Sequence, residues 1–269
     1  MMRIALRLLA ALVAAGCQTV QTTQPGVVGV DRPQSMLVSA QSVNRSAERA
    51  YRRVLDEASA RGQLNRDPAQ VARIRALAAR LIPQTAAFRA DAPGWQWEVN
   101  VITSNEVNAW AMPGGKIAFH SGLLERLQPS DDEVAAVMGH EIAHALREHG
   151  RERASQAVAQ GFGIAVLGAA AGMSEGAMDL TQLVLDLTFN LPNSRTDETE
   201  ADRIGVELAA RAAFDPRAAV SLWQKMTQLA GGKGPQFLSS HPSHATRISD
   251  LRAYAERVMP LYEAARAKR

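Results

Sequence analysis

The chain has 269 residues, of which 46% are hydrophobic and 21% are charged, a balance typical of a globular protein with a sizeable core. Thirty basic residues against 27 acidic ones give a formal net charge of +3, but the sequence has no basic patch of the kind that binds nucleic acid. The single cysteine, Cys17, excludes an intramolecular disulfide and a cysteine-rich zinc module. A metal site in this chain therefore needs histidine and carboxylate ligands.

The first 16 residues have the pattern of a secretory signal peptide, because two arginines precede an apolar run that is too short to span a bilayer stably. Residues 14–17 resemble a bacterial lipobox, although Ala14 stands where leucine is usual. We expect Cys17 to carry a lipid anchor, and the alternative is an ordinary signal peptide with an incidental cysteine. By resemblance to known lipoprotein sorting, Gln18 favours the outer membrane, facing the periplasm of a bacterial cell envelope.

The region before the first strand is predicted to hold a tether and two helices. Residues 17–35 are rich in Gln, Thr, Gly, Val and Pro without helical periodicity, which is typical of a tether that carries no chemistry. Amphipathic packing helices are expected over 36–60 and 68–89. Beyond them, Trp95, Trp97, Val99 and Val101 alternate with polar residues, which predicts a strand with one buried face.

A β-hairpin is predicted next, with strands over 107–112 and 116–120 joined by a Pro-Gly-Gly turn, and a short helix is expected from Ser121. From Ser130 onward the sequence is helical almost to its end. Ser130 and Glu133 have the spacing of a capping box, and Asp215 is expected to be an N-cap followed by proline at the first helical position. The apolar segment 157–172 is short for a membrane span and fits a buried or interfacial helix.

The helix expected from Asp131 contains an HExxH motif, His140-Glu141-Ile142-Ala143-His144. Residues four apart share a helix face, so the two imidazoles can bind one zinc ion while Glu141 reaches a water molecule on that metal. The helix is apolar nearly all round, which predicts that it is buried. Two histidines and a glutamate in such a place need partners, because burying them unsatisfied is costly.

A catalytic zinc site needs a third protein ligand and an open position. Glu198 and Asp202 lie four residues apart in a later helix. Glu198 can supply the carboxylate ligand, and Asp202 can accept the free ring N–H of a zinc-bound histidine. The alternative is a solvated acidic helix start, since carboxylates favour a helix N-terminus, and this alternative is our expectation for Asp197 and Glu200.

Three segments, GHEIAHAL, SRTDETEADRIG and NAWAMPGGKIAFHSGLL, together resemble the gluzincin metalloendopeptidases of the HtpX and CAAX-prenyl-protease type. The resemblance covers roughly residues 95–252. It implies an α+β, mostly α, zincin-like metallopeptidase domain in which a small sheet or hairpin packs beside the HExxH helix. In this family the first Glu of an ExxxD motif is the zinc ligand, which is Glu198 here.

Because the sequence has no long transmembrane spans, it is most similar to periplasmic lipoprotein members of this family, in a branch without tetratricopeptide repeats. The expected organisation is a signal peptide over 1–16, a lipidated cysteine and tether over 17–35, and a single metallopeptidase domain over 36–269. Within that domain we expect N-terminal helices over 36–90 and a catalytic core over 95–258.

The segment His241-Pro242-Ser243-His244 resembles the His-Pro segment near the end of this family's peptidase domain. In some relatives this histidine caps the zinc and holds the enzyme inactive. His241 is therefore a candidate zinc cap or a donor to the transition-state oxyanion, and a surface position is the further alternative. His120, His149 and His244 lack metal-ligand spacing and are expected to be structural or solvent-facing.

The predicted reaction is hydrolysis of peptide bonds with one zinc ion per chain, held by His140, His144 and Glu198, and with Glu141 as the base that takes the proton of the zinc-activated water. The edge strand Asn108-Ala109-Trp110-Ala111 offers unpaired backbone groups to an extended polypeptide, and a covered structural edge is the alternative. Together with the resemblance, this favours quality control of unfolded or misassembled envelope proteins. The rival hypothesis is a chaperone-like outer-membrane assembly lipoprotein with little or repressed proteolysis.

Overall fold

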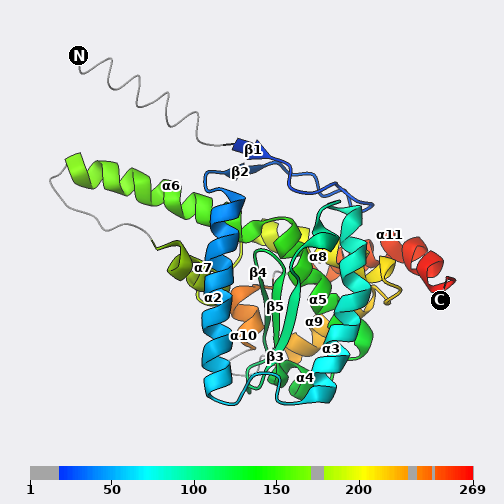
Figure 1. Ribbon diagram of the computed structural model, residues 1–269. Coiled ribbons are helices and arrows are strands. Elements are labelled where there is room, and N and C mark those ends of the chain that lie inside the picture. The colour runs from blue at the N-terminus through cyan, green and yellow to red at the C-terminus, as the bar shows by residue number, and fades with distance from the viewer. Residues whose placement is uncertain (1–17, 171–178, 230–234, 244–245, 269) are drawn as a thin grey trace.

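The computed structural model describes residues 18–170, 179–229, 235–243 and 246–268, without the side chains of residues 18 and 162–170. The predicted signal peptide, Cys17 and His244 lie outside the described residues. In chain order the elements are β1 (Gln18–Val20), β2 (Gln34–Met36), α2 (Ala40–Ala60), α3 (Pro68–Leu81), two 3₁₀ turns η1 (Ile82–Ala87) and η2 (Ala92–Gly94), β3 (Glu98–Ile102), β4 (Ala109–Met112), β5 (Lys116–His120), α4 (Ser121–Leu127), α5 (Asp131–Leu146), α6 (His149–Ala170), α7 (Leu180–Phe189), α8 (Arg195–Arg211), α9 (Ala218–Gln228), α10 (Gln236–Ser240) and α11 (Arg247–Arg266). The described chain is mostly helical around a small sheet, as expected (Figure 1).

The central sheet has three strands in the order β3-β5-β4. β5 runs parallel to β3 and antiparallel to β4, so the predicted hairpin is confirmed. Its turn depends on Gly115, whose φ is +84°, and a Cβ there would lie 2.8 Å from the ring of Trp97. Glycine meets both requirements, since it tolerates positive φ and has no Cβ.

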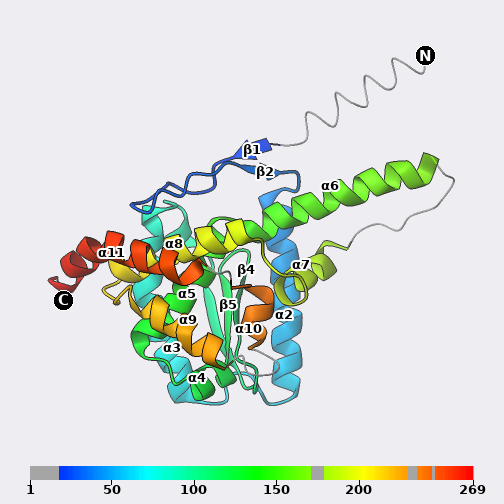
Figure 2. The same cartoon turned by 180° about the vertical axis from the view of Figure 1, so that it is seen from behind.

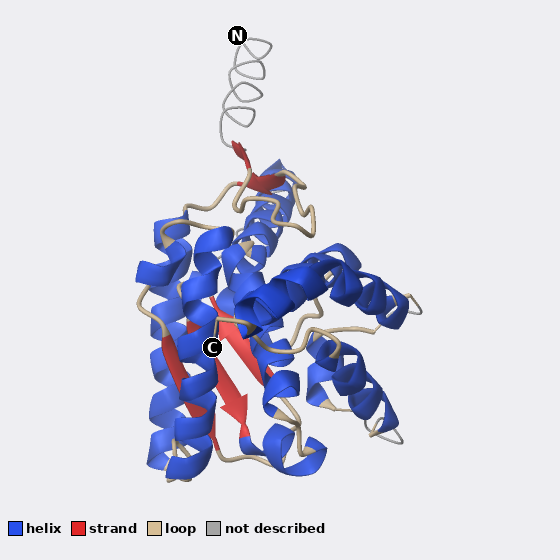
Figure 3. Ribbon diagram, turned by 90° about the vertical axis from the view of Figure 1, so that its right-hand side faces the viewer, coloured by secondary structure: helices blue, strands red, loops and turns tan. Residues whose placement is uncertain are grey.

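Helices cover both faces of this sheet (Figure 3). On one face, Ile117 and Phe119 of β5 join the main core with α3 and α5. On the other face, Ala118 packs with Trp110 and Tyr51, the latter from α2. The alternation follows the two-residue period of a strand, and it places α5 directly beside the hairpin, as the resemblance implied.

Capping boxes begin the two helices that matter most for function. In α5, Glu133 and Ser130 exchange hydrogen bonds between side chain and backbone, as predicted. In α8, Ser194 and Asp197 make the same reciprocal pair. Each box satisfies two backbone N–H groups that a helix leaves free at its N-terminus, and it fixes the residue at which the helix begins. The register of the functional side chains along each helix follows from that starting point.

Several predicted boundaries differ from those observed. The first helix begins at Ala40, and α3 ends at Leu81 because Pro83 lacks the N–H that would continue it, so a 3₁₀ turn follows. Asp215 is not the N-cap of α9. Its side chain accepts the backbone N–H of Arg217 at 2.9 Å in a turn, and the helix begins later, at Ala218.

Residues 18–36 differ from the tether that the sequence predicted. β1 and β2 form an antiparallel pair, and Val28 and Val30 between them are buried in the main core. The backbone N–H of Val28 donates to Glu207 of α8 at 2.9 Å. Buried apolar residues and polar contacts together join this segment to the body, and composition alone did not reveal them.

Helix α6 extends away from the body in two opposite views (Figures 1 and 2). The predicted apolar segment 157–172 falls mostly on this helix, and its described side chains, 157–161, are half-buried or exposed. Residues 171 and 172 lie outside the described residues. Among the described helices, none combines the length and the hydropathy that a bilayer span requires.

Candidate active site

Four buried side chains from three parts of the chain converge at one point. His140 and His144 lie on α5, Glu198 lies on α8, and His241 follows α10; one ligand atom from each lies within 4.8 Å of all the others. His140 Nε2 and His144 Nε2 are 3.1 Å apart. Glu198 places Oε2 at 3.4 Å from His140 Nε2 and Oε1 at 3.3 Å from His144 Nε2.

These separations fit a zinc ion. Ligand atoms bound to one zinc in a tetrahedron at about 2.0–2.2 Å lie about 3.3–3.6 Å from each other. Two imidazole nitrogens and a carboxylate are also the donor set that zinc takes in catalytic sites. The residues that the sequence predicted as ligands are therefore brought together at the spacing that the metal requires.

A close contact between α5 and α8 creates this arrangement. A Cβ on Gly139 would lie 2.8 Å from the carbonyl oxygen of Gly205, and a Cβ on Gly205 would lie 2.8 Å from the backbone nitrogen of His140. The two glycines let the helix backbones touch one residue before the first histidine of the motif. Glu198 lies about two turns before Gly205 on α8, which brings its carboxylate to the two imidazoles.

Asp202 and Arg247 bind the side chains of the predicted zinc ligands His140 and Glu198. His140 Nδ1 lies 2.9 Å from Asp202 Oδ1, as predicted for a residue that accepts the second ring N–H of a ligand. Arg247, which is fully buried, donates from Nη2 to Asp202 Oδ1 at 2.8 Å and pairs with Glu198 Oε2 at 2.9 Å. Its guanidinium lies 3.4 Å from the centre of the Trp223 ring. The sequence analysis assigned no role to Arg247.

The carboxylates of Glu198 and Asp202 stabilise positive charge at His140. Burial by itself lowers the pKa of His140, but the two carboxylates outweigh it and raise this pKa to about 9. Burial lowers the pKa of His144 well below its usual value, which keeps its imidazole in the neutral form that binds metals. The two carboxylates thus favour positive charge next to them at this end of the pocket.

Glu141, the predicted base, points into the same site. Its side chain is buried, and Oε1 has no hydrogen-bond partner in the described structure. Burial raises the pKa of Glu141, an effect that His241, His140 and a hydrogen bond from the backbone N–H of Ala111 oppose. An ionisable neighbour is His241, whose Nε2 lies 3.4 Å from Oε1 of Glu141. A buried carboxylate oxygen that accepts no hydrogen bond beside a metal site is suited to accept a proton from water.

His241 reaches the site because α10 is hydrogen-bonded to the segment that precedes β4. The backbone N–H of Phe237 in α10 donates to the carbonyl of Val107 at 3.1 Å, and the His241 ring stacks on that of Phe237 with centroids 4.3 Å apart. His241 Nδ1 then lies 3.1 Å from His140 Nε2 and 2.9 Å from Glu198 Oε1. This is the position expected of a zinc cap and excludes the surface alternative.

A cleft leads to Glu141 and His144 between β4 and α7. Trp110, Ala111 and Pro113 line it on the hairpin side, and Val184, Leu187 and Thr188 line it on the helix side. β4 is an outer strand of the three-stranded sheet. Of the predicted substrate strand, Ala109, Trp110 and Ala111 lie in β4, and Asn108 precedes it. Asn108, Ala109 and Trp110 are buried, and Ala111 is half-buried.

Asp197 and Glu200 are not the solvated helix start that the sequence predicted. Both are buried, with exposed fractions of 5% and 6%. Glu200 accepts from Arg147 Nε at 2.9 Å and lies 3.1 Å from His149 Nε2. Their charge is matched by arginines that are far away in sequence, so no local pattern identified it. Of the histidines without ligand spacing, His149 is buried and His120 nearly so, which favours structural roles for both.

Comparison with known proteins agrees with this geometry. A model described as Peptidase family M48 matches residues 68–255. Mitochondrial metalloendopeptidase OMA1 of Saccharomyces cerevisiae is 32% identical over 178 residues, which cover 63% of this chain and 50% of the yeast protein. OMA1 of Schizosaccharomyces pombe is 38% identical over 158 residues, or 58% and 46% of the two chains. The beta-barrel assembly-enhancing protease of Escherichia coli strain K12 is 29% identical over 170 residues, or 60% and 35%.

The chain therefore spans about half, or less, of the length of these curated relatives. The relatives are OMA1 and the assembly-enhancing protease, so the narrower resemblance to HtpX and the CAAX-prenyl proteases, and to a lipoprotein branch, stays a prediction. Membership of the broader family, in contrast, is shown by the matched region. The matched region covers most of the chain and contains His140, His144, Glu198 and His241. The chain belongs to peptidase family M48, a family of zinc metallopeptidases.

Proposed function

We propose that this chain is a zinc-dependent metalloendopeptidase that hydrolyses peptide bonds of unfolded or misassembled cell-envelope proteins. The observation that carries the proposal is the buried Oε1 of Glu141, which accepts no hydrogen bond, beside the cluster of His140, His144 and Glu198. A structural metal site is closed by its ligands and has no use for a base next to it. A hydrolytic site needs one.

When bound, zinc supplies Lewis-acid polarisation of the scissile carbonyl and of the attacking water. The side chains of the protein move the proton and orient the metal ligands. Glu141 accepts the proton of the water at Oε1 and then delivers it to the leaving amine. Asp202 accepts the Nδ1 proton of His140, which leaves Nε2 of that ring facing the metal.

An extended polypeptide is the substrate that suits the cleft. β4 has no strand on its outer side within the described residues, so its backbone can pair with a substrate strand. Ala111 of β4 and Glu141 line the same cleft, so a chain paired along β4 passes beside the base. Backbone pairing reads little sequence, which suits unfolded chains. One relative's name, beta-barrel assembly-enhancing protease, supports an envelope substrate, whereas the OMA1 relatives are mitochondrial.

The test of the activity compares the wild type with Glu141→Gln. Both should bind one zinc ion per chain, and the variant should cleave an unfolded protein about 10²–10⁴-fold more slowly, the usual contribution of a general base. Glu57→Gln, on an exposed part of α2, is the matched control and should cleave like the wild type. Equal cleavage by the wild type and Glu141→Gln would contradict the mechanism.

Anchoring through a lipid at Cys17, with the body in the periplasm at the outer membrane, is part of the proposal. The lipobox-like residues 14–17 support it. Expression of the full chain with a labelled fatty acid should label the wild type and leave Cys17→Ser unlabelled. Cell fractionation should then find the wild type in the outer membrane and the variant released. Label on the variant would contradict anchoring at Cys17.

One observation favours the second candidate, a chaperone-like assembly lipoprotein with repressed proteolysis. His241 occupies the side of the ligand cluster where the open position of a catalytic zinc would lie. Zinc binding without cleavage of any unfolded protein by the wild type, together with suppression of its aggregation, would favour this function. Cleavage that depends on Glu141 would favour the peptidase.

A further inference from the structure

His144 has an unusual partner on the side away from the metal position. The second ring nitrogen of His140 faces a carboxylate, Asp202. His144 Nδ1 instead lies 2.9 Å from Nδ1 of His149, a histidine with an exposed fraction of 1% at the start of α6. With Nε2 of His144 facing the metal, its proton is on Nδ1 and is donated to His149. His149 must then carry its own proton on Nε2.

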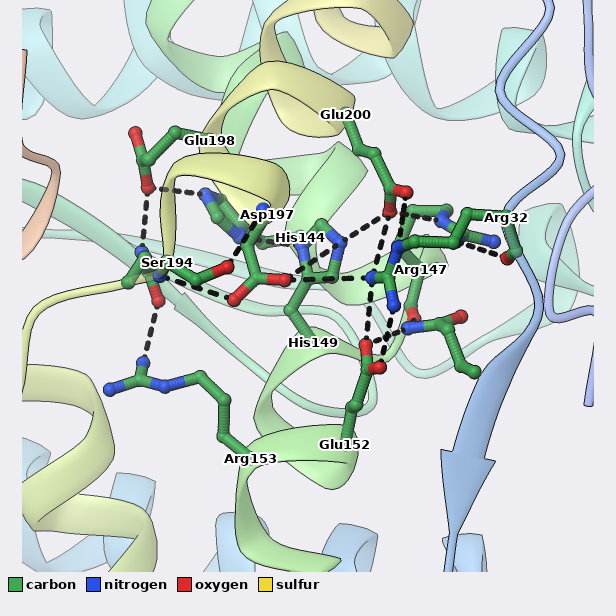
Figure 4. A network of polar contacts seen from close by, with 12 residues as sticks. Arg32, His144, Arg147, His149, Glu152, Arg153, Ser194, Asp197, Glu198 and Glu200 are labelled. Carbon is green, nitrogen blue, oxygen red and sulfur yellow. Dashed lines mark hydrogen bonds and ion pairs between the residues drawn. The ribbon is translucent and has the colours of Figure 1, made fainter. Parts of the chain in front are cut away.

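That proton has an acceptor. His149 Nε2 lies 3.1 Å from Oε2 of Glu200, two residues after Glu198 on α8. The carboxylate of Asp202 orients His140 directly. Glu200 orients His144 indirectly, through the ring of His149. Figure 4 shows the chain of contacts from Glu198 and His144 through His149 to Glu200.

Glu200 is in turn fixed by two arginines. Arg147 Nε donates to Oε2 at 2.9 Å. Arg32 Nε donates to Oε1 at 2.7 Å, and the same guanidinium bonds both oxygens of Glu152 at 2.7 and 2.9 Å. Arg32 thereby joins Glu200 of α8 to Glu152 of α6, and α6 is the helix that also carries His149. A planar fork with several donors can hold two carboxylates in this way.

Arg32 comes from the folded N-terminal segment, outside the region 68–255 that matches the family. The segment is held at this place by further buried contacts. Gln34 Nε2 donates to Glu152 Oε2 at 2.6 Å and to the carbonyl of Arg147 at 2.8 Å. In return, Arg147 Nη2 donates to the carbonyl of Arg32 at 2.8 Å. Arg32 is therefore part of a built network and not a mobile surface side chain.

We propose that His149 is a positioning residue for the zinc ligand His144, and that Arg32 of the N-terminal segment completes its support by holding Glu200. The metal site of this chain then extends beyond the family domain to residues 18–36. The inference rests on the zinc site of the proposed function. It is tested by metal affinity, which does not require that the chain cleave anything.

The first experiment measures zinc affinity of the full chain by competition with a chelator. Arg32→Ala should weaken it on the order of 10-fold, because partners of metal ligands contribute about 10–100-fold. Arg203→Ala is the matched control. Arg203 has a similar side-chain exposure, 30% against 33%, and makes a two-bond pair with Asp250 away from the network. It should change the affinity less than about twofold.

The second experiment addresses the histidine itself. His149→Leu removes the acceptor for His144 and should lower zinc affinity about 10–100-fold. His149→Gln keeps one acceptor and one donor and should restore most of the loss. Cobalt in place of zinc gives a visible spectrum that reports ligand geometry, and we expect it to change in His149→Leu and in Arg32→Ala but not in Arg203→Ala.

Unchanged zinc affinity and cobalt spectrum in Arg32→Ala would overturn the role of the N-terminal segment. Equal losses in Arg32→Ala and Arg203→Ala would also overturn it, since the effect would then be general destabilisation. Equal affinities of His149→Leu and His149→Gln would overturn the role of His149. If zinc binds as described but nothing is cleaved, the peptidase proposal fails while this inference stands.

Discussion

The imidazole of His241 lies between the base and the carboxylate ligand: its Nε2 is 3.4 Å from Oε1 of Glu141, and its Nδ1 is 2.9 Å from Oε1 of Glu198. One ring therefore contacts both the group that would take a proton from water and the group that would hold the metal. If His241 acts as a zinc cap, which is one of its two candidate roles, the ring restrains the reaction as long as it stays in this place.

Replacing His241 with alanine should raise cleavage of an unfolded protein several-fold, because the position next to Glu141 becomes open to water. The initial rate at saturating zinc is the quantity to measure. Glu57→Gln, on an exposed part of α2, is the control and should leave the rate near that of the wild type. A fall in rate for His241→Ala would instead assign the ring to the transition-state oxyanion.

Glu198→Gln should lower zinc affinity by on the order of 100-fold or more, since it removes a ligand and not only the partner of one. It also leaves the buried guanidinium of Arg247 with one carboxylate fewer, so the melting temperature should fall as well. Chelator competition and thermal unfolding measure the two effects separately. Undiminished zinc affinity would mean that Glu198 is not the third ligand.

The close contact between Gly139 and Gly205 predicts that a substitution there lowers both the stability of the fold and the zinc affinity. Gly205→Ala should destabilise the fold by about 1–3 kcal/mol, because the added Cβ meets the backbone at His140 and forces the helices apart. Zinc affinity should fall with it, since Glu198 moves with α8. Gly94→Ala meets no atom within 4 Å and is the control. A Gly205→Ala protein with normal stability and affinity would show that the helices do not need this close approach.

The capping box of α5 predicts a dependence of stability on pH. Burial raises the pKa of Glu133, but hydrogen bonds from Lys225, Ser221 and the Ser130 backbone outweigh it and hold this pKa below the ordinary 4.5. A lowered folded pKa stabilises the protein above about pH 4.5, and this contribution is lost as the pH falls through the folded value.

Glu133→Gln should therefore lower the free energy of unfolding at pH 7 by about 1–2 kcal/mol. The difference from the wild type should shrink as the pH drops below 4.5. Urea unfolding at several pH values measures it. Glu57→Gln, on an exposed part of α2, should show little difference at any pH. A constant difference for Glu133→Gln down to acid pH would indicate a packing effect instead of the charge.

The parts of the site that follow from local geometry were predictable from the sequence. HExxH spacing places His140 and His144 on one helix face wherever the helix lies. The hairpin followed from strand alternation and a glycine-rich turn. The prediction of Glu198 and Asp202 required two observations, namely their four-residue spacing in the later helix and the need of a catalytic zinc for a third ligand. The structure places both residues at the site.

The parts that depend on distant contacts were not predictable. Arg247 binds Asp202 across 45 residues, and Arg32 binds Glu200 across 168. No periodicity links such pairs, so the burial of Glu200 was missed and residues 18–35 were interpreted as a tether. The order of the strands was also open, because a hairpin fits at either edge of a strand that precedes it.

The folding of residues 18–36 onto the body limits how far the cleft could move from a membrane to which Cys17 is anchored. The first described residue, Gln18, already belongs to β1, and β1 is paired with β2 against the body. Under the proposed acylation of Cys17, the lipid would therefore be joined to the enzyme by almost no slack chain. The cleft would stay at a nearly fixed height above the bilayer surface. Such an enzyme could cut only polypeptides that emerge at, or are held near, that surface.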